Sequence, residues 1–66
     1  MIREEKIKVL FDMQKKVHIT CGDRFYNGTI IDVNDLKDFL ILIDDKLGEV
    51  PIMFEEITNI EPYMER

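Results

Sequence analysis

Cysteine and histidine are almost absent from this chain of 66 residues, and each occurs once, as Cys21 and His18. A single cysteine cannot form an internal disulfide, and one cysteine with one histidine cannot complete a four-ligand zinc site. A chain this short buries only about 60% of the surface that its unfolded form exposes, so its core is marginal. Because neither a disulfide nor a zinc site within the chain can stabilise the fold, association with another chain is the remaining way to add stability.

Long apolar runs and linkers are also missing. No stretch approaches the roughly 20 apolar residues that span a bilayer, so we expect no contact with a membrane. Glu4 and Glu5 stand where a signal peptide would be apolar, and the unpaired cysteine fits a reducing compartment, so we expect a cytoplasmic protein. No repeat or low-complexity tract divides the sequence, which predicts one domain over residues 1–66.

The residue patterns of catalysis are missing as well. There is no nucleophile paired with a base, no glycine-rich phosphate loop and no set of metal ligands, so we expect neither an enzyme nor a cofactor. His18 is interpreted as a solvent-side or interface residue of a strand, and Cys21 as a small buried hydrophobe. Five acidic residues in two expected turns lack calcium-loop spacing and are interpreted as solvated charges. They are Asp44, Asp45, Glu49, Glu55 and Glu56.

The clearest structural signal begins at residue 17. Val17, Ile19 and Cys21 alternate with polar residues at the two-residue period of a half-buried strand. Gly22 and Asp23 then supply turn chemistry, and a second β-rich stretch follows. Two antiparallel strands are therefore the minimum interpretation.

The second stretch contains Gly28, and a missing side chain inside a strand marks a sharp bend or a bulge. Residues 32–38 are polar and are expected to form a hairpin connection. Residues 39–43 are apolar without a break, so we expect a third strand with both faces covered.

The N-terminal segment mixes charged and apolar residues, and four side chains fall on one side at helical spacing. They are Ile7, Leu10, Phe11 and Gln14. We interpret residues 2–14 as an amphipathic helix, and the alternative is a strand over residues 6–11, which also alternate at period two. Acidic residues near the start and Lys15 and Lys16 near the end match the helix macrodipole and favour the helix.

The C-terminal third predicts two more strands. Residues 49–54 form the fourth, in which Pro51 requires a position where the ladder needs no donor, at an edge or a bulge. One helical turn is expected at residues 54–57, and a short fifth strand at residues 58–61, stopped by Pro62.

These elements predict a mainly β fold. An N-terminal helix over residues 1–15 precedes five short antiparallel strands over residues 16–62, which close most economically as a small, strongly bent barrel. Residues 63–66 are expected to form a C-terminal tail.

Three features of this layout carry a resemblance. They are the helix that leads into Lys15-Lys16-Val17, the run Val17-x-Ile19 with Gly22-Asp23-Arg24-Phe25-Tyr26-x-Gly28-x-Ile30, and the hydrophobic third strand. The chain resembles the Sm-like (Lsm) family, in which a helix precedes a bent five-stranded SH3-like barrel. The resemblance implies assembly into rings that bind RNA.

The family's uridine pocket is altered here. Where its first motif has Asp, a stacking side chain and Asn, this chain has Asn34, Leu36 and Asp38. Met53 and Phe54 replace the Arg-Gly of its second motif, which removes a guanidinium that would stack on the base. We therefore expect a degenerate pocket, with Asn34, Leu36 and Asp38 as candidate RNA-binding residues.

Basic side chains supply further candidates, although the chain has 9 basic and 14 acidic residues and a formal charge of −5, which argues against general capture of nucleic acid. A ring would repeat four lysines around one face, where each phosphate contact adds salt-sensitive affinity. They are Lys6, Lys8, Lys15 and Lys16. Alternatively, these lysines only keep the helix soluble. We take Lys15, Lys16 and Arg24 as candidates, since Arg24 precedes the rings of Phe25 and Tyr26, one of which is expected in the core.

Exposed strand edges predict a homo-oligomer, because edge strands pair readily with a neighbour's. The candidate interface residues are Val50, Ile52, Phe54, Thr58 and Ile60. Our first hypothesis is an Sm-like ring that binds RNA or serves as a ribonucleoprotein scaffold. The alternative is an acidic module of the same fold that binds a basic protein and no RNA, as small barrels resembling the bacterial Rho-inhibitor family do.

Overall fold

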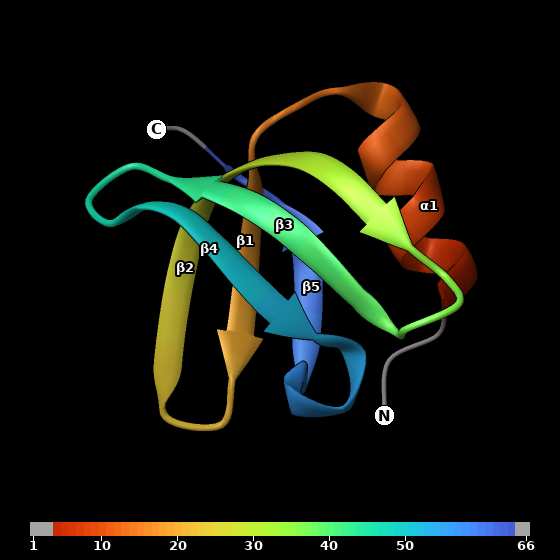
Figure 1. Cartoon of the computed structure of the whole chain (residues 1–66). Helices are drawn as coiled ribbons and strands as arrows, with labels where there is room; N and C mark the ends of the chain where they lie inside the picture. The colour runs from red at the N-terminus through yellow and green to blue at the C-terminus, as the bar shows by residue number, and fades with distance from the viewer. Residues whose placement is uncertain (1–3, 65–66) are drawn as a thin grey trace.

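One helix and five strands make up the computed structural model, which describes residues 4–64 (Figure 1). The elements are α1 (Glu4–Met13), β1 (Val17–Cys21), β2 (Arg24–Asn34), β3 (Phe39–Asp44), β4 (Gly48–Met53), the 3₁₀ turn η1 (Phe54–Glu56) and β5 (Asn59–Pro62). All the strands pair antiparallel in one sheet of order β4-β3-β2-β1-β5. The expected mainly β fold, a helix followed by five antiparallel strands, is confirmed. The sheet is open, because β4 and β5 do not pair with each other.

Helix α1 buries one stripe. Ile7 and Leu10 are buried, Phe11 packs against the same core, and Glu4 and Glu5 occupy the first turn. The strand alternative for this segment is wrong. Gln14, expected on the buried side, lies beyond the helix with a φ of 52° and donates its N–H to the Phe11 carbonyl at 3.0 Å. The predicted boundaries at residues 1–3 lie outside the described residues.

A tight turn joins β1 and β2. Cys21 pairs with Arg24, and Gly22 between them has a φ of 65°, a conformation that glycine adopts without a steric penalty. Val17 and Ile19 point into the core, whereas His18 and Thr20 are only half-buried on the other face. The predicted alternation of β1 is confirmed.

The second strand changes partners halfway along its length. Gly28 pairs with Val17 of β1 and also with Asp44 of β3. A Cβ atom at position 28 would lie 1.8 Å from the Ile43 carbonyl oxygen, so only glycine permits this approach. The ladder skips a residue between Ile30 and Asp32, which places the bulge three positions after the glycine.

The connection expected over residues 32–38 is wrong at its start, because β2 continues to Asn34 and pairs with β3 up to Phe39. The bulge makes this possible, since it shifts the register so that Val33 faces inward opposite Leu40. The expectation that both faces of the third strand are covered is also wrong. Leu40 and Leu42 are buried, but Ile43 is 40% exposed.

The prolines lie in the two outermost strands. Pro51 lies in the edge strand β4 and pairs with Ile41 of β3, so the predicted edge position is confirmed. Phe54 begins the 3₁₀ turn instead of ending β4. Pro62 was expected to stop the fifth strand, but it belongs to β5 and pairs with Val17, because the missing donor is tolerated at a sheet edge.

The core lies between the inner face of the sheet and α1, which packs against β2 and β5 (Figure 1). Its buried members are Ile7, Leu10, Val17, Ile19, Ile30, Leu40, Leu42, Ile52, Phe54, Ile57 and Ile60. No helix in the described part of the chain is long and apolar enough to cross a membrane.

Candidate functional site

The predicted RNA-binding residues lie in three separate places. Lys15 and Lys16 lie between α1 and β1, whereas Arg24 is exposed at the far end of β1, where it pairs with Cys21. The remaining three candidates, Asn34, Leu36 and Asp38, lie at the turn between β2 and β3. The structure therefore does not bring the six candidates into one site.

The turn between β2 and β3 is built largely by its own polar groups. The Asn34 side-chain oxygen accepts a hydrogen bond from the Lys37 N–H at 3.0 Å, and Asp38 has a φ of 55°. Leu36 is 97% exposed at the tip. Asp35 forms an ion pair of 2.7 Å with Lys8, and this contact raises the pKa of the lysine. Residues 35–38 of this turn are exposed, and Asn34 is half-buried.

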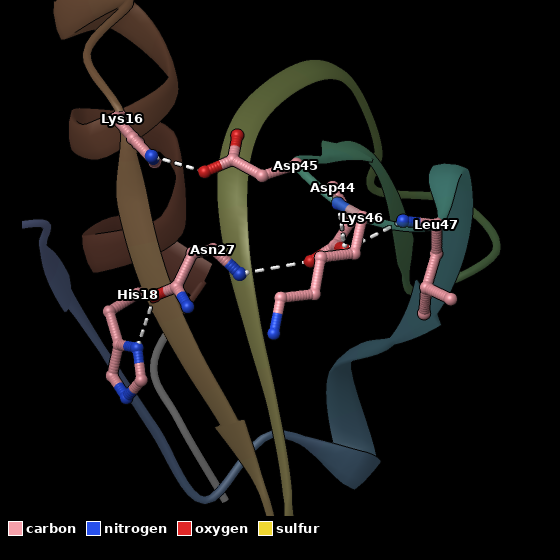
Figure 2. Close-up of polar contacts among 7 residues, drawn as sticks. All are labelled: Lys16, His18, Asn27, Asp44, Asp45, Lys46 and Leu47. Atoms are coloured by element: carbon pink, nitrogen blue, oxygen red, sulfur yellow. Dashed lines mark hydrogen bonds and ion pairs between the residues drawn. The ribbon is translucent and has the colours of Figure 1, made fainter.

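The turn between β3 and β4, at the opposite end of β3, is organised by Asp44 (Figures 1 and 2). This side chain is buried, and its Oδ2 accepts the N–H groups of Lys46 and Leu47, both at 2.9 Å. Its Oδ1 accepts the Asn27 N–H at 3.0 Å. These donors, chiefly Lys46 and Leu47, lower the pKa of Asp44. The interpretation of Asp44 as a solvated charge is therefore wrong.

Lys16 ties the start of β1 to this same turn. Its ammonium forms an ion pair with Asp45 (Figure 2). It also lies 4.3 Å above the ring centroid of Tyr63. The Tyr63 N–H donates to the Lys16 carbonyl at 2.9 Å, which fixes the aromatic ring beside the strand. Lys16 is thus part of a structured surface.

Rings also gather on the outer side of β1 and β2. The imidazole of His18 stacks on Phe25 with a centroid distance of 5.7 Å and an interplanar angle of 19°. His18 Nδ1 lies 2.5 Å from the Asn27 side-chain oxygen (Figure 2). One of these two rings was expected in the core: Phe25 is 63% exposed, whereas Tyr26 is half-buried and packs against the core without being a fully buried member of it.

A surface cavity of about 540 Å³ connects these features. It is lined by Phe25, Asn27, Asp44, Asp45, Lys46, Leu47 and Tyr63. The cavity offers two aromatic rings, a side-chain amide, the carboxylates of Asp44 and Asp45, and the Lys46 ammonium, which has no ion pair among the described residues. Sequence reasoning missed this site, because its residues come from β2, the β3–β4 turn and the C-terminal end. The one available signal was the Asp44-to-Leu47 segment, in which an aspartate can accept the N–H groups that follow it.

The free edges of the sheet expose backbone groups of β4 and β5. The Phe54 N–H donates to the Asp38 carbonyl at 2.9 Å, and bonded and non-bonded pairs alternate along an antiparallel ladder. The backbone groups of Glu49, Pro51 and Met53 therefore face outward from β4. By the same alternation, the Tyr63-to-Lys16 bond directs the groups of Ile60 outward from β5.

The five candidate interface residues differ in exposure. Ile52, Phe54 and Ile60 are buried in the core, Val50 is half-buried and Thr58 is exposed. Their buried side chains fill the subunit itself, so an interface at these strands would use the backbone edges.

The remaining chemically notable groups have structural roles. Burial, with a smaller repulsion from Glu56, raises the pKa of the Cys21 thiol, which disfavours the reactive thiolate. No cluster of three or more His, Cys, Asp or Glu side chains within residues 4–64 could hold a metal ion.

Comparisons of the chain with protein-family models, with curated proteins and with solved structures give no match.

Proposed function

We propose that this chain is an Sm-like barrel that assembles through the edges of β4 and β5 and binds single-stranded RNA. The observation that carries the proposal is the strand order β4-β3-β2-β1-β5 behind an N-terminal helix. With β2 shared between two partner strands, this order favours a strongly bent sheet whose two edges are the last two strands in the sequence, β4 and β5. Edges of this kind pair with the edges of a neighbouring copy.

The outward backbone groups support a specific pairing. Pro51 and Pro62 each lack a donor, so the remaining N–H groups at the free edges are few. Ile60 of one copy can exchange two hydrogen bonds with either Met53 or Glu49 of the next. The prolines thus limit the registers in which two copies can join.

The cavity beside the β3–β4 turn supports RNA as the ligand. Aromatic rings stack on bases regardless of sequence, and a nearby ammonium can contact phosphate. Phe25 and Tyr63 supply rings, and Lys46 supplies the cation. This surface replaces the degenerate pocket at Leu36, whose side chain has no ring.

Native mass spectrometry of the wild-type chain with a short oligouridine at low salt tests both parts. We expect a closed multimer of roughly five or more copies that gains one RNA mass. Met53→Pro removes an outward donor at a φ of −73°, which proline adopts, so it should reduce the mass without unfolding the chain. Met53→Leu keeps the donor and is the control. An unchanged multimer in Met53→Pro would contradict pairing through this edge.

A matched pair of lysines tests the RNA site. Lys46→Ala should weaken oligouridine binding several-fold, and Phe25→Ala about tenfold. Lys37→Ala removes the same charge at the β2–β3 turn and should have little effect. A larger loss of binding in Lys37→Ala than in Lys46→Ala would instead place the RNA site at the β2–β3 turn, where the Sm-like family has its uridine pocket. Absence of RNA binding would contradict this part of the proposal.

The alternative, an acidic module that binds a basic protein, is favoured by one observation. Two of the lysines expected to face RNA, Lys8 and Lys16, are paired with Asp35 and Asp45. A monomer or dimer that gains no oligouridine mass in native mass spectrometry would support this alternative.

A further inference from the structure

An apolar surface lies on the outer side of β3, away from the core. Leu40 and Leu42 point inward, and the residues that alternate with them, Phe39, Ile41 and Ile43, point outward. On the neighbouring strands, Met53 pairs with Phe39 and Pro51 with Ile41, and the bulged residue Ile31 directly precedes Asp32, the β2 partner of Ile41. We call these six residues the outer β3 face.

The outer β3 face is partly exposed, and its members Phe39 and Ile41 are half-buried. Helix α1 buries Ile7 and Leu10 in the cluster that contains Leu40 and Leu42, so it lies on the inner side of the sheet. Ile31 is 48% exposed, Ile43 40% and Met53 38%. A contiguous apolar patch on a small protein marks an interaction site.

The charges around the face define its partner. Neither β3 nor the positions that face it outward on β2 and β4 carry Lys or Arg, whereas Asp32 flanks the patch on β2 and Glu49 on β4. Neither carboxylate forms an ion pair among the described residues. A second copy docked face to face would bring the same carboxylates and no cation. A partner with basic groups on both flanks complements the surface.

The width and length of the outer β3 face match those of an α-helix. Two strand spacings separate β2 from β4, about 10 Å, which is close to the diameter of an α-helix. The six residues of β3 extend about 20 Å, the length of roughly 13 helical residues. We propose that the outer β3 face binds a basic amphipathic helix of a partner protein, with its apolar stripe along β3 and basic residues toward Asp32 and Glu49. This proposal uses a different surface from the RNA cavity and holds whether or not RNA is bound.

Two synthetic helical peptides of about 14 residues test it. One has Leu on one side and Lys on the other, and the second replaces each Lys with Glu. Titrated into the isotope-labelled full chain, the Leu/Lys peptide should shift the amide resonances of β3 and of its outward neighbours, and the Leu/Glu peptide should not. Shifts confined to another surface would overturn the proposal.

Matched variants separate this docking from general attraction to an acidic protein. Asp32→Asn with Glu49→Gln should raise the Kd of the Leu/Lys peptide about tenfold. Asp23→Asn with Glu61→Gln removes the same charges elsewhere and should leave it within about twofold. Equal losses in both pairs would overturn the proposal.

Ile43→Ala tests the apolar part and should also raise the Kd several-fold. Thermal unfolding of each variant verifies that it is folded. If the free chain instead forms dimers whose dilution shifts the same amides, a second copy occupies the face and the proposal is wrong. Oligouridine shifting the outer β3 face would likewise contradict it.

Discussion

The two turns at the ends of β3 differ in how their aspartates are used. At the β2–β3 turn, Asp35 pairs with Lys8 in solvent and Leu36 is 97% exposed. At the β3–β4 turn, the buried Asp44 accepts three backbone N–H groups, and an aromatic cavity lies alongside. Both turns contact other elements, but a buried carboxylate bonded to the backbone and a lined cavity occur only at the β3–β4 turn.

The largest effect is expected where β2 approaches the β3–β4 turn. Gly28→Ala places a Cβ against the Ile43 carbonyl oxygen and should destabilise the fold by more than about 3 kcal/mol, or prevent folding. Urea unfolding measures this. Gly22→Ala, at a positive φ but with open space around it, should cost only about 1 kcal/mol. Equal costs would mean that the close approach does not exist.

The second prediction compares the side chains that cap the two turns. Asp44→Ala leaves backbone donors without their acceptor and should lower the free energy of unfolding by about 1–3 kcal/mol. Asn34→Ala removes one hydrogen bond at an exposed turn and should cost about 0.5–1 kcal/mol. A larger cost at Asn34 would reverse the ranking of the turns.

Stability at acid pH sharpens the same contrast. The folded-state pKa of Asp44 is lowered, chiefly by the N–H groups of Lys46 and Leu47. Its stabilisation is therefore complete above the unfolded aspartate pKa of about 3.9, and is lost as the pH falls through the lower folded value. Asp44→Asn should flatten the dependence of stability on pH between about pH 5 and 2. An unchanged slope in thermal unfolding would show that Asp44 is not the group responsible.

The smallest effect is expected at the tip of the β2–β3 turn. Leu36→Ser changes a side chain that is 97% exposed, so the free energy of unfolding should stay within about 0.5 kcal/mol. Urea unfolding at two protein concentrations measures this. A loss that grows with concentration would mean that Leu36 is buried against another copy in solution.

Local patterns predicted most of the fold. Alternation located β1, the unbroken apolar run located β3, and Pro51 indicated an edge position, because these features depend on periodicity or on one residue's own geometry. The helix was predicted correctly from the spacing of Ile7 and Leu10, although its end was not. The strand boundaries at Asn34 and Pro62 were missed, because a bulge and a sheet edge depend on the partner strand.

Candidate sites were harder to predict than strands. Lys15, Lys16 and Arg24 were grouped by charge, but they lie at different ends of β1. Phe25 and Tyr63 line one cavity although they are far apart in sequence, and Asp44 is buried although it lies in a run of polar residues.

The sequence by itself determined the elements, because hydrophobic period, glycine and proline act through local backbone geometry. It also excluded an internal disulfide, since only one cysteine is present. Only the tertiary structure decided which charges are paired, which rings share a cavity and which face of β3 stays open. Those properties depend on the sheet order and register, which bring together residues that are distant along the chain.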